Sequence, residues 1–336
     1  MQCRSGQLPH RSWKKFICDT SRGYRQEASD RAPSVPFISL DSNRYFAHSA
    51  KLEDFQAVTT LPSWDPHPFR QRAFLPKFPA LLPQDASKQP PASQSWFETI
   101  SKEQPLRSLK YDYLSRYGDV IVPLELTRKD GAGRETFERF TAPLKLFLDW
   151  MQQQAAEARP PSPASSSPRI YLAQCQISDL PKPLQADLPT PDVVLKAGTG
   201  DLYDANIWIG TSPTYTPLHR DPNPNFFLQL AGSKVVRLFP PNLGREIFGA
   251  VQSKLGRDGS AAFRGEEMMQ GEERALLEQE VWGDGDASLK LLPGLESDGF
   301  EARVEEGNAL FIPLGWWHSI KSVGTGTTAS VNWWFR

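Results

Sequence analysis

Short apolar runs alternate with glycine- and proline-containing turns through the second half of the chain. The clearest runs are 169–174, 206–211, 225–230, 234–239, 308–313 and 328–335. Each has the length of one strand, and short strands separated by such turns are typical of β-sandwiches and barrels. The pattern therefore predicts a mainly β fold with surrounding helices, whose core lies in this half of the chain.

The first half carries a more mixed pattern. It predicts a strand at 35–40, a short helical run followed by an extended segment at 69–82, a polar linker at 83–95 and a strand at 119–126. We expect these pieces to elaborate the β core rather than to form a second one.

The segment 141–157 has the pattern of an amphipathic helix. Its apolar residues recur at helical spacing and form one stripe: Leu144, Phe147, Leu148 and Met151. Thr141 is the predicted N-cap, and Pro143 falls in the first turn, where a missing N–H is harmless. We interpret the stripe as a contact with the core.

Changes in composition divide the chain into segments. We expect an N-terminal tail at 1–34 and one domain at 35–336, made of an elaboration at 35–168, a barrel core at 169–336 and an insertion within it at 242–300. The stretch 158–168 is rich in Pro and Ser and is expected to be disordered. The insertion is charged and rich in glycine, and one helix is predicted at 266–280, with Leu276 and Leu277 facing inward.

Overall composition narrows the classes of partner. The net charge is −1 and the pI is near 6.5, so no global basic field attracts nucleic acid, although a local patch would suffice for binding. Cys3, Cys18 and Cys175 form no paired framework, which fits a reducing compartment. No apolar run approaches the ~18 residues of a membrane-spanning helix, so we expect no membrane partner. The oligomeric state is left open.

The N-terminus has a basic character. Its first 18 residues contain Arg4, Arg11, Lys14 and Lys15 and no acidic residue. Such a segment is typical of a mitochondrial transit peptide, and an ordinary disordered tail is the alternative. We expect an intracellular protein, cytoplasmic or nuclear, or mitochondrial if the basic segment is a targeting signal.

Histidine and aspartate residues suggest a metal site. His219 and Asp221 are two residues apart, and in a strand such residues point to the same face. On its own this spacing more often marks a surface hydrogen-bonding pair. His318, in the strand-like run 309–320, is the candidate for a third ligand. Two histidines and one carboxylate form the facial triad of non-haem Fe(II) oxygenases, which leaves coordination positions open for a 2-oxo acid and O₂.

Two stretches resemble a known family. TPLHRDPNPNFFLQLAGSKVVRLFPP at 216–241 is similar to the first iron-binding strand region of JmjC-type hydroxylases, and EEGNALFIPLGWWHSI at 305–320 to the second. The resemblance is to the family of the asparaginyl hydroxylase that acts on hypoxia-inducible factor and its small JmjC relatives. It implies a double-stranded β-helix, the jelly-roll barrel of cupins, with His219, Asp221 and His318 as catalytic iron ligands. It also implies Fe(II), O₂ and the cosubstrate 2-oxoglutarate.

The resemblance implies a site for the distal carboxylate of 2-oxoglutarate. Lys234 matches the lysine that pairs with this carboxylate, and Thr216 and Tyr171 match hydroxyl donors at the same end. Physical chemistry agrees for Lys234, because a buried dianion needs a cation and hydrogen-bond donors. Taken without the motif, a lysine at a strand start is more often solvated, and Tyr171 could equally be a core tyrosine.

Three further matches concern the iron end of the same site. Asn225 and Asn332 match two asparagines there, and Trp334 resembles an aromatic wall of the pocket. The resemblance therefore implies a 2-oxoglutarate-dependent dioxygenase whose substrate is a protein or peptide side chain. Hydroxylation of an RNA base or a small molecule is the alternative enzyme activity. A non-catalytic cupin-type binding module and a redox-neutral cupin that uses Zn²⁺ or Mn²⁺ also stay open.

Overall fold

A computed structural model describes residues 55–100, 106–129, 135–156, 168–257, 266–283, 291–292 and 295–336. All described residues lie in one compact unit. The expected tail at 1–34, the strand at 35–40 and most of the stretch at 158–168 lie outside the described residues.

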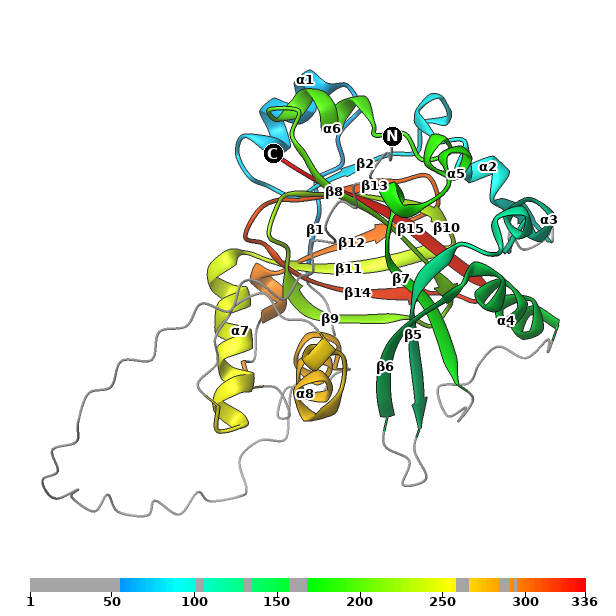
Figure 1. Cartoon of the computed structure of the whole chain (residues 1–336). Helices are drawn as coiled ribbons and strands as arrows, with labels where there is room; N and C mark the ends of the chain where they lie inside the picture. The colour runs from blue at the N-terminus through cyan, green and yellow to red at the C-terminus, as the bar shows by residue number, and fades with distance from the viewer. Residues whose placement is uncertain are drawn as a thin grey trace, which may run out of the picture. The chain divides into compact units, whose positions relative to one another are not determined.

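Strands form the centre of this unit, in two main sheets (Figure 1). The larger sheet has the order β2 (Ala80–Leu82), β13 (Ala309–Ile312), β10 (Asn225–Ala231), β15 (Thr327–Phe335), β8 (Leu202–Thr211), β7 (Arg169–Gln176), β5 (Ile121–Lys129) and β6 (Glu135–Pro143). The smaller sheet has the order β1 (Gln56–Ala57), β12 (Phe300–Val304), β11 (Ser233–Phe239), β14 (Trp317–Val323) and β9 (Tyr215–Arg220). A separate hairpin pairs β3 (Phe97–Thr99) with β4 (Arg107–Leu109).

The order of the strands is that of a jelly roll. From β8 to β11 and again from β13 to β15, the chain crosses from one sheet to the other at each step. Between the described strands the pairings are antiparallel except for that of β1 with β12, which is parallel. The expected jelly-roll class is confirmed, as a sandwich of two sheets whose described strands do not close into one barrel.

Helices lie around the sheets. The α-helices are α1 (Pro66–Phe69), α2 (Ala92–Ser95), α3 (Tyr111–Leu114), α4 (Leu144–Ala156), α5 (Lys182–Ala186), α6 (Asp192–Ala197), α7 (Pro241–Lys254) and α8 (Gly271–Trp282). A π-helical turn, η2 (Arg70–Phe74), continues α1. Short 3-10 turns are η3 (Ala86–Lys88), η4 (Ser115–Tyr117), η5 (Ile177–Asp179), η6 (Glu266–Met269) and η8 (Leu295–Asp298).

Alternation along the strands separates an inner face from an outer face in each sheet. The outer face of the large sheet belongs to the main apolar cluster, in which Phe226 and Trp333 lie together with Phe147 of α4. The outer face of the small sheet packs Phe239 and Trp317 against α7 and α8 of the insertion. A third cluster, which includes Phe227, Val236 and Leu310, lies between the sheets. Polar residues that alternate with the outer clusters therefore point into the sandwich.

Most predicted elements are confirmed, with three corrections. The apolar stripe of 141–157 is buried as expected, but α4 begins at Leu144 and Thr141 belongs to strand β6. The cap prediction was wrong because the backbone carbonyl of Val120 accepts the N–H of Leu144 instead. The predicted linker 83–95 was also wrong in part, since η3 and α2 interrupt it. Within the insertion, the helix expected at 266–280 appears as η6 and α8, whereas the longer helix α7 was missed.

Candidate metal centre

Strands β9 and β14 place two histidines side by side. His219 and His318 are directly opposed in this antiparallel pair, and their ring centroids are 4.2 Å apart. Their sequence neighbours Leu218 and Trp317 belong to the outer cluster under α7 and α8, so both imidazoles point into the sandwich. The register of one strand pair therefore brings together residues that are about one hundred positions apart in sequence.

Asp221 completes a set of three ligand types. Its Oδ1 lies 3.8 Å from His219 Nε2 and its Oδ2 lies 3.6 Å from His318 Nε2. One ligand atom from each of the three residues lies within 4.8 Å of the others. His219 and Asp221 had been expected on one strand. Strand β9 instead ends at Arg220, so Asp221 is the first residue beyond it. The expected convergence is nevertheless found, and the spacing suits a single metal ion.

Hydrogen bonds and burial prepare both imidazoles for a metal. His219 Nδ1 lies 2.8 Å from the carbonyl oxygen of Pro217. In the neutral tautomer that carries its proton on Nδ1, this nitrogen donates to the carbonyl, and Nε2 keeps its lone pair for a metal. His318 is 1% exposed. Burial, with a further contribution from His219, lowers its pKa to about 4, although the charge of Asp221 acts in the opposite direction. His318 is therefore neutral at pH 7, as a metal ligand must be.

Asn225, on the inner face of the large sheet, orients the carboxylate of Asp221, and Asn332 on the same face in turn orients Asn225. Asn225 Nδ2 donates to Asp221 Oδ2 at 2.7 Å, and Asn332 Nδ2 donates to Asn225 Oδ1 at 2.9 Å. Both asparagines are at least 95% buried. We call this chain of Asn332, Asn225 and Asp221 the amide relay. It joins the two sequence-predicted asparagines to the triad.

Lys234 is a buried cation without an anion. It lies on β11 at 4% exposure, its Nζ donates to Ser330 Oγ at 2.8 Å, and it sits 5.2 Å from the ring centroid of Phe227. No described carboxylate forms an ion pair with it, and burial alone lowers its pKa to about 7. A charged amine in this position lacks its natural partner, so the site suits the carboxylate of a bound ligand.

The other predicted residues share the inner faces but lack hydrogen bonds to the triad. Thr216 is paired in register with Ile320, whose side chain belongs to the cluster between the sheets. The ring of Tyr171 covers Gly210 so closely that a Cβ there would lie 2.2 Å from it, and burial raises the pKa of the Tyr171 phenol. Trp334 is the cross-strand neighbour of Asn225.

Sequence reasoning missed several polar residues of the inner face. Ser330 accepts from Lys234, and Trp208 carries a buried indole N–H without a hydrogen-bond partner. Asp204 accepts a hydrogen bond from Gln176 Nε2 at 3.1 Å. Alternation along 202–211 was the available signal, because it places Asp204 and Trp208 on one face, opposite to the apolar residues between them.

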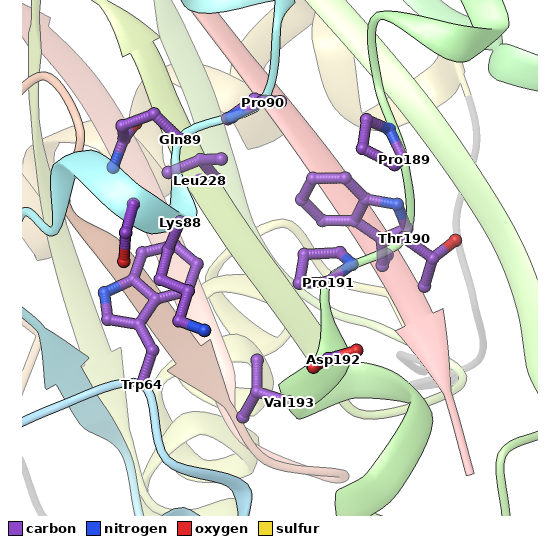
Figure 2. A pocket seen from close by; sticks show the side chains of 12 residues that line it. Trp64, Lys88, Gln89, Pro90, Pro189, Thr190, Pro191, Asp192, Val193 and Leu228 are labelled. Atoms are coloured by element: carbon purple, nitrogen blue, oxygen red, sulfur yellow. The ribbon is translucent and has the colours of Figure 1, made fainter.

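A separate pocket of 270 Å³ lies on the outer side of the large sheet (Figure 2). Its lining includes Trp64, Lys88, Asp192, Leu228 and Trp333. Leu228 and Trp333 alternate with inner-face residues and belong to the outer apolar cluster, so this pocket faces away from the triad. The candidate metal centre is identified by its donor set, not by this pocket.

Comparisons with known proteins agree with the jelly-roll fold. A family model described as a cupin-like domain matches residues 66–336. Lysine-specific demethylase JMJ30 of Arabidopsis thaliana is 27% identical over 194 residues, which cover 56% of this chain and 40% of that protein. Lysine-specific demethylase 8 of Danio rerio is 28% identical over 166 residues, 49% of this chain and 36% of that protein. JmjC domain-containing protein D of Dictyostelium discoideum is 28% identical over 163 residues, 46% of this chain and 32% of that protein.

The matched regions are less than half of the length of these relatives. Their names therefore describe larger proteins than the region that is shared. None of the helices in the described part of the chain is long and apolar enough to cross a membrane.

Proposed function

The chain belongs to the cupin-like domain family, in its group of JmjC-type oxygenases that use Fe(II), 2-oxoglutarate and O₂, and from this premise we propose that it hydroxylates a side chain of a protein or peptide substrate. The observation that carries the proposal is the convergence of His219, Asp221 and His318 within 4.8 Å. Two imidazoles and one carboxylate leave open coordination positions on an octahedral ion, which a structural zinc site does not need.

Lys234 supports the proposed cosubstrate site. Lys234 lies on β11, and Leu238 of the same strand is opposed to His318. Lys234 is therefore four residues away, along β11, from the position next to the triad. This corresponds to about 13 Å along the strand. The lysine side chain and a short dicarboxylic acid together can span that gap. In the proposal, Lys234 pairs with the distal carboxylate, and Thr216 and Tyr171 supply hydroxyl donors nearby.

Each proposed role follows from the chemistry of the side chain. A bound Fe(II) supplies the redox chemistry that activates O₂ for attack on a C–H bond. His219, Asp221 and His318 would hold the ion on one side only, and Asn225 would fix the orientation of the carboxylate. Phe227 and other apolar residues between the sheets would exclude water from the bound dicarboxylate, which strengthens its pairing with Lys234.

An anaerobic titration tests the metal and cosubstrate together. Addition of Fe(II) and 2-oxoglutarate to the wild-type chain is expected to produce a weak visible charge-transfer band, and exposure to O₂ is expected to release succinate. His219→Ala should abolish both signals. His67→Ala is the matched control, because His67 is exposed on α1, whose Phe69 packs in the outer apolar cluster, and it should behave as the wild type does. Equal signals from wild type and His219→Ala would refute the site.

The substrate class needs a separate experiment. The chain would be incubated with unmodified peptides, methylated-lysine peptides, RNA and small-molecule pools, and products would be analysed by mass spectrometry. A gain of one oxygen atom on an unmodified peptide supports side-chain hydroxylation, whereas loss of a methyl group indicates demethylation. Oxidation of RNA or of a small molecule alone would replace the proposed substrate and leave the oxygenase proposal intact.

A further inference from the structure

The amide relay ends in a buried acceptor that has no partner. The carboxylate of Asp221 can only accept in its ionised form, so Asn225 must turn its N–H₂ toward it and its Oδ1 toward Asn332. Asn332 must then use its own N–H₂ on Asn225. This fixes the polarity of both amides, and the remaining Oδ1 of Asn332 is buried without a hydrogen-bond partner. A ligand that satisfies it must donate a hydrogen bond.

A second acceptor lies on the same inner face. Asn225 is opposed to Trp334 across β10 and β15, and Trp334 is opposed to Asp204 across β15 and β8. Ala205 and Phe335, which follow Asp204 and Trp334, pack toward the outer cluster, so Asp204 and Trp334 point inward. Asp204 is a diagonal cross-strand neighbour of Asn332, because Asn332 is opposed to Asn206. Such neighbours are roughly 7–8 Å apart.

Asp204 is positioned but not neutralised. Gln176 Nε2 donates to its Oδ2 at 3.1 Å, and the backbone N–H of Ala205 donates to its Oδ1 at 2.8 Å. In the described part of the chain, no lysine or arginine forms an ion pair with it; Arg336 pairs instead with Asp201 at 3.6 Å. An inward carboxylate beside a partly buried tryptophan ring is a suitable environment for a cation.

We propose that Asp204 is a specificity-determining residue that binds a cationic side chain of the substrate, an ammonium or guanidinium group, with the Oδ1 of Asn332 as a second acceptor and the ring of Trp334 beside the cation. This inference rests on the proposed function and adds the charge of the substrate to it. 2-Oxoglutarate cannot fill this role, since its carboxylates are acceptors and would be repelled by Asp204. A cation with several N–H donors matches both acceptors.

Binding of blocked amino acids tests the inference directly. The full chain, loaded with Fe(II) and 2-oxoglutarate under argon, would be titrated with N-acetyl-arginine amide, N-acetyl-lysine amide and their neutral counterparts, N-acetyl-citrulline amide and N-acetyl-norleucine amide. Calorimetry measures each Kd. A charge-assisted hydrogen bond to a positioned carboxylate predicts that at least one cation binds about tenfold more tightly than its neutral counterpart. The two pairs distinguish guanidinium from ammonium recognition.

Variants assign the preference to Asp204. Asp204→Asn keeps an acceptor for Gln176 and removes the charge, so the ratio of neutral to cationic Kd should fall to about one. Asp204→Glu should retain a preference. Asp201→Asn is the matched control, since it removes one negative charge three positions away and should leave the ratio unchanged. If Asp204→Asn does not fold, Gln176→Ala, which removes the amide that positions the carboxylate, should lower the ratio instead.

The possible results separate this inference from the proposed function. No cation preference in the wild type, or an unchanged preference after Asp204→Asn, would overturn the role of Asp204. Succinate release measured on the same preparations reports on the oxygenase chemistry itself. Its absence from the wild type would refute the proposed function, whereas succinate release without cation preference would refute only the assignment of Asp204.

Discussion

Lys234 and Ser330 join the two sheets through the interior of the sandwich, with the ammonium nitrogen 2.8 Å from the hydroxyl oxygen. A neutral hydroxyl satisfies one donor of the lysine but does not balance its charge. The pKa of Lys234 is lowered to about 7, because burial without a counter-ion disfavours the charged form. Lys234 therefore destabilises the ligand-free fold, whereas it would stabilise a complex with an anionic ligand.

Lys234→Met should stabilise the ligand-free protein at and below neutral pH. The pKa of Lys234 is lowered from 10.5 to about 7 in the fold, so between these values the unfolded state binds more protons than the folded state does. The stability cost of the lysine is thus fully present below pH 7 and disappears as the pH rises toward 10.5. Melting temperatures of both proteins from pH 6 to 10.5 should differ most at the acid end and converge at the alkaline end. A constant difference across this range would contradict the buried, unpaired lysine.

The same lysine predicts how 2-oxoglutarate binding depends on pH. Lys234 must be protonated to pair with a carboxylate, and in the free protein it loses its proton above about pH 7. Affinity for 2-oxoglutarate should therefore fall by about tenfold per pH unit above that value. Calorimetric titrations of the anaerobic Fe(II) protein measure this slope. Lys234→Arg stays charged and should flatten it, whereas Lys234→Met should bind roughly 100-fold more weakly at pH 7, because one partner of a buried ion pair is lost.

Removal of Asn225 should weaken metal binding without unfolding the protein. Asn225→Ala deletes the hydrogen bond that orients Asp221, and such outer-shell losses typically reduce metal affinity by about 10–100-fold. Asn332→Ala should have a smaller effect, because Asn332 acts only through Asn225. Titration with Mn²⁺ or Co²⁺ measures the affinities. Asn223→Ala is the control, since Asn223 accepts from Arg336 and should not alter metal affinity.

Two glycines of α7 provide a matched test of how the insertion packs. A Cβ at Gly244 would lie 2.2 Å from Trp317 Cγ, whereas a Cβ at Gly249 would meet nothing within 4 Å. Gly244→Ala should therefore destabilise the fold by about 1–3 kcal/mol through overpacking. Gly249→Ala should stabilise it by about 0.5–1 kcal/mol through helix propensity. Denaturant unfolding measures both, and equal effects would mean that α7 does not dock on Trp317.

Local pattern was sufficient for much of the fold, but the candidate metal ligands were identified with the help of the family resemblance. Alternating apolar runs located β7, β8, β10, β11, β13 and β15, since each such strand is marked by its own residues. The family resemblance proposed His219, Asp221 and His318, and the fold brings them together. The helix at 141–157 was recognised from its stripe, but its start depended on a contact with Val120, which a local pattern does not contain.

Tertiary structure decided which polar groups are partners and which are left without one. The sequence singled out Asn225, Asn332 and Lys234 but did not show which groups each of them contacts. Hydrogen-bond partners depend on strand register between segments far apart in the chain. Only the register produces the amide relay, leaves Lys234 without an anion and turns Asp204 toward the interior. The sequence thus determines which chemical groups are available to the site. Their desolvation and pairing, which set pKa values and ligand preference, arise only when two sheets enclose them.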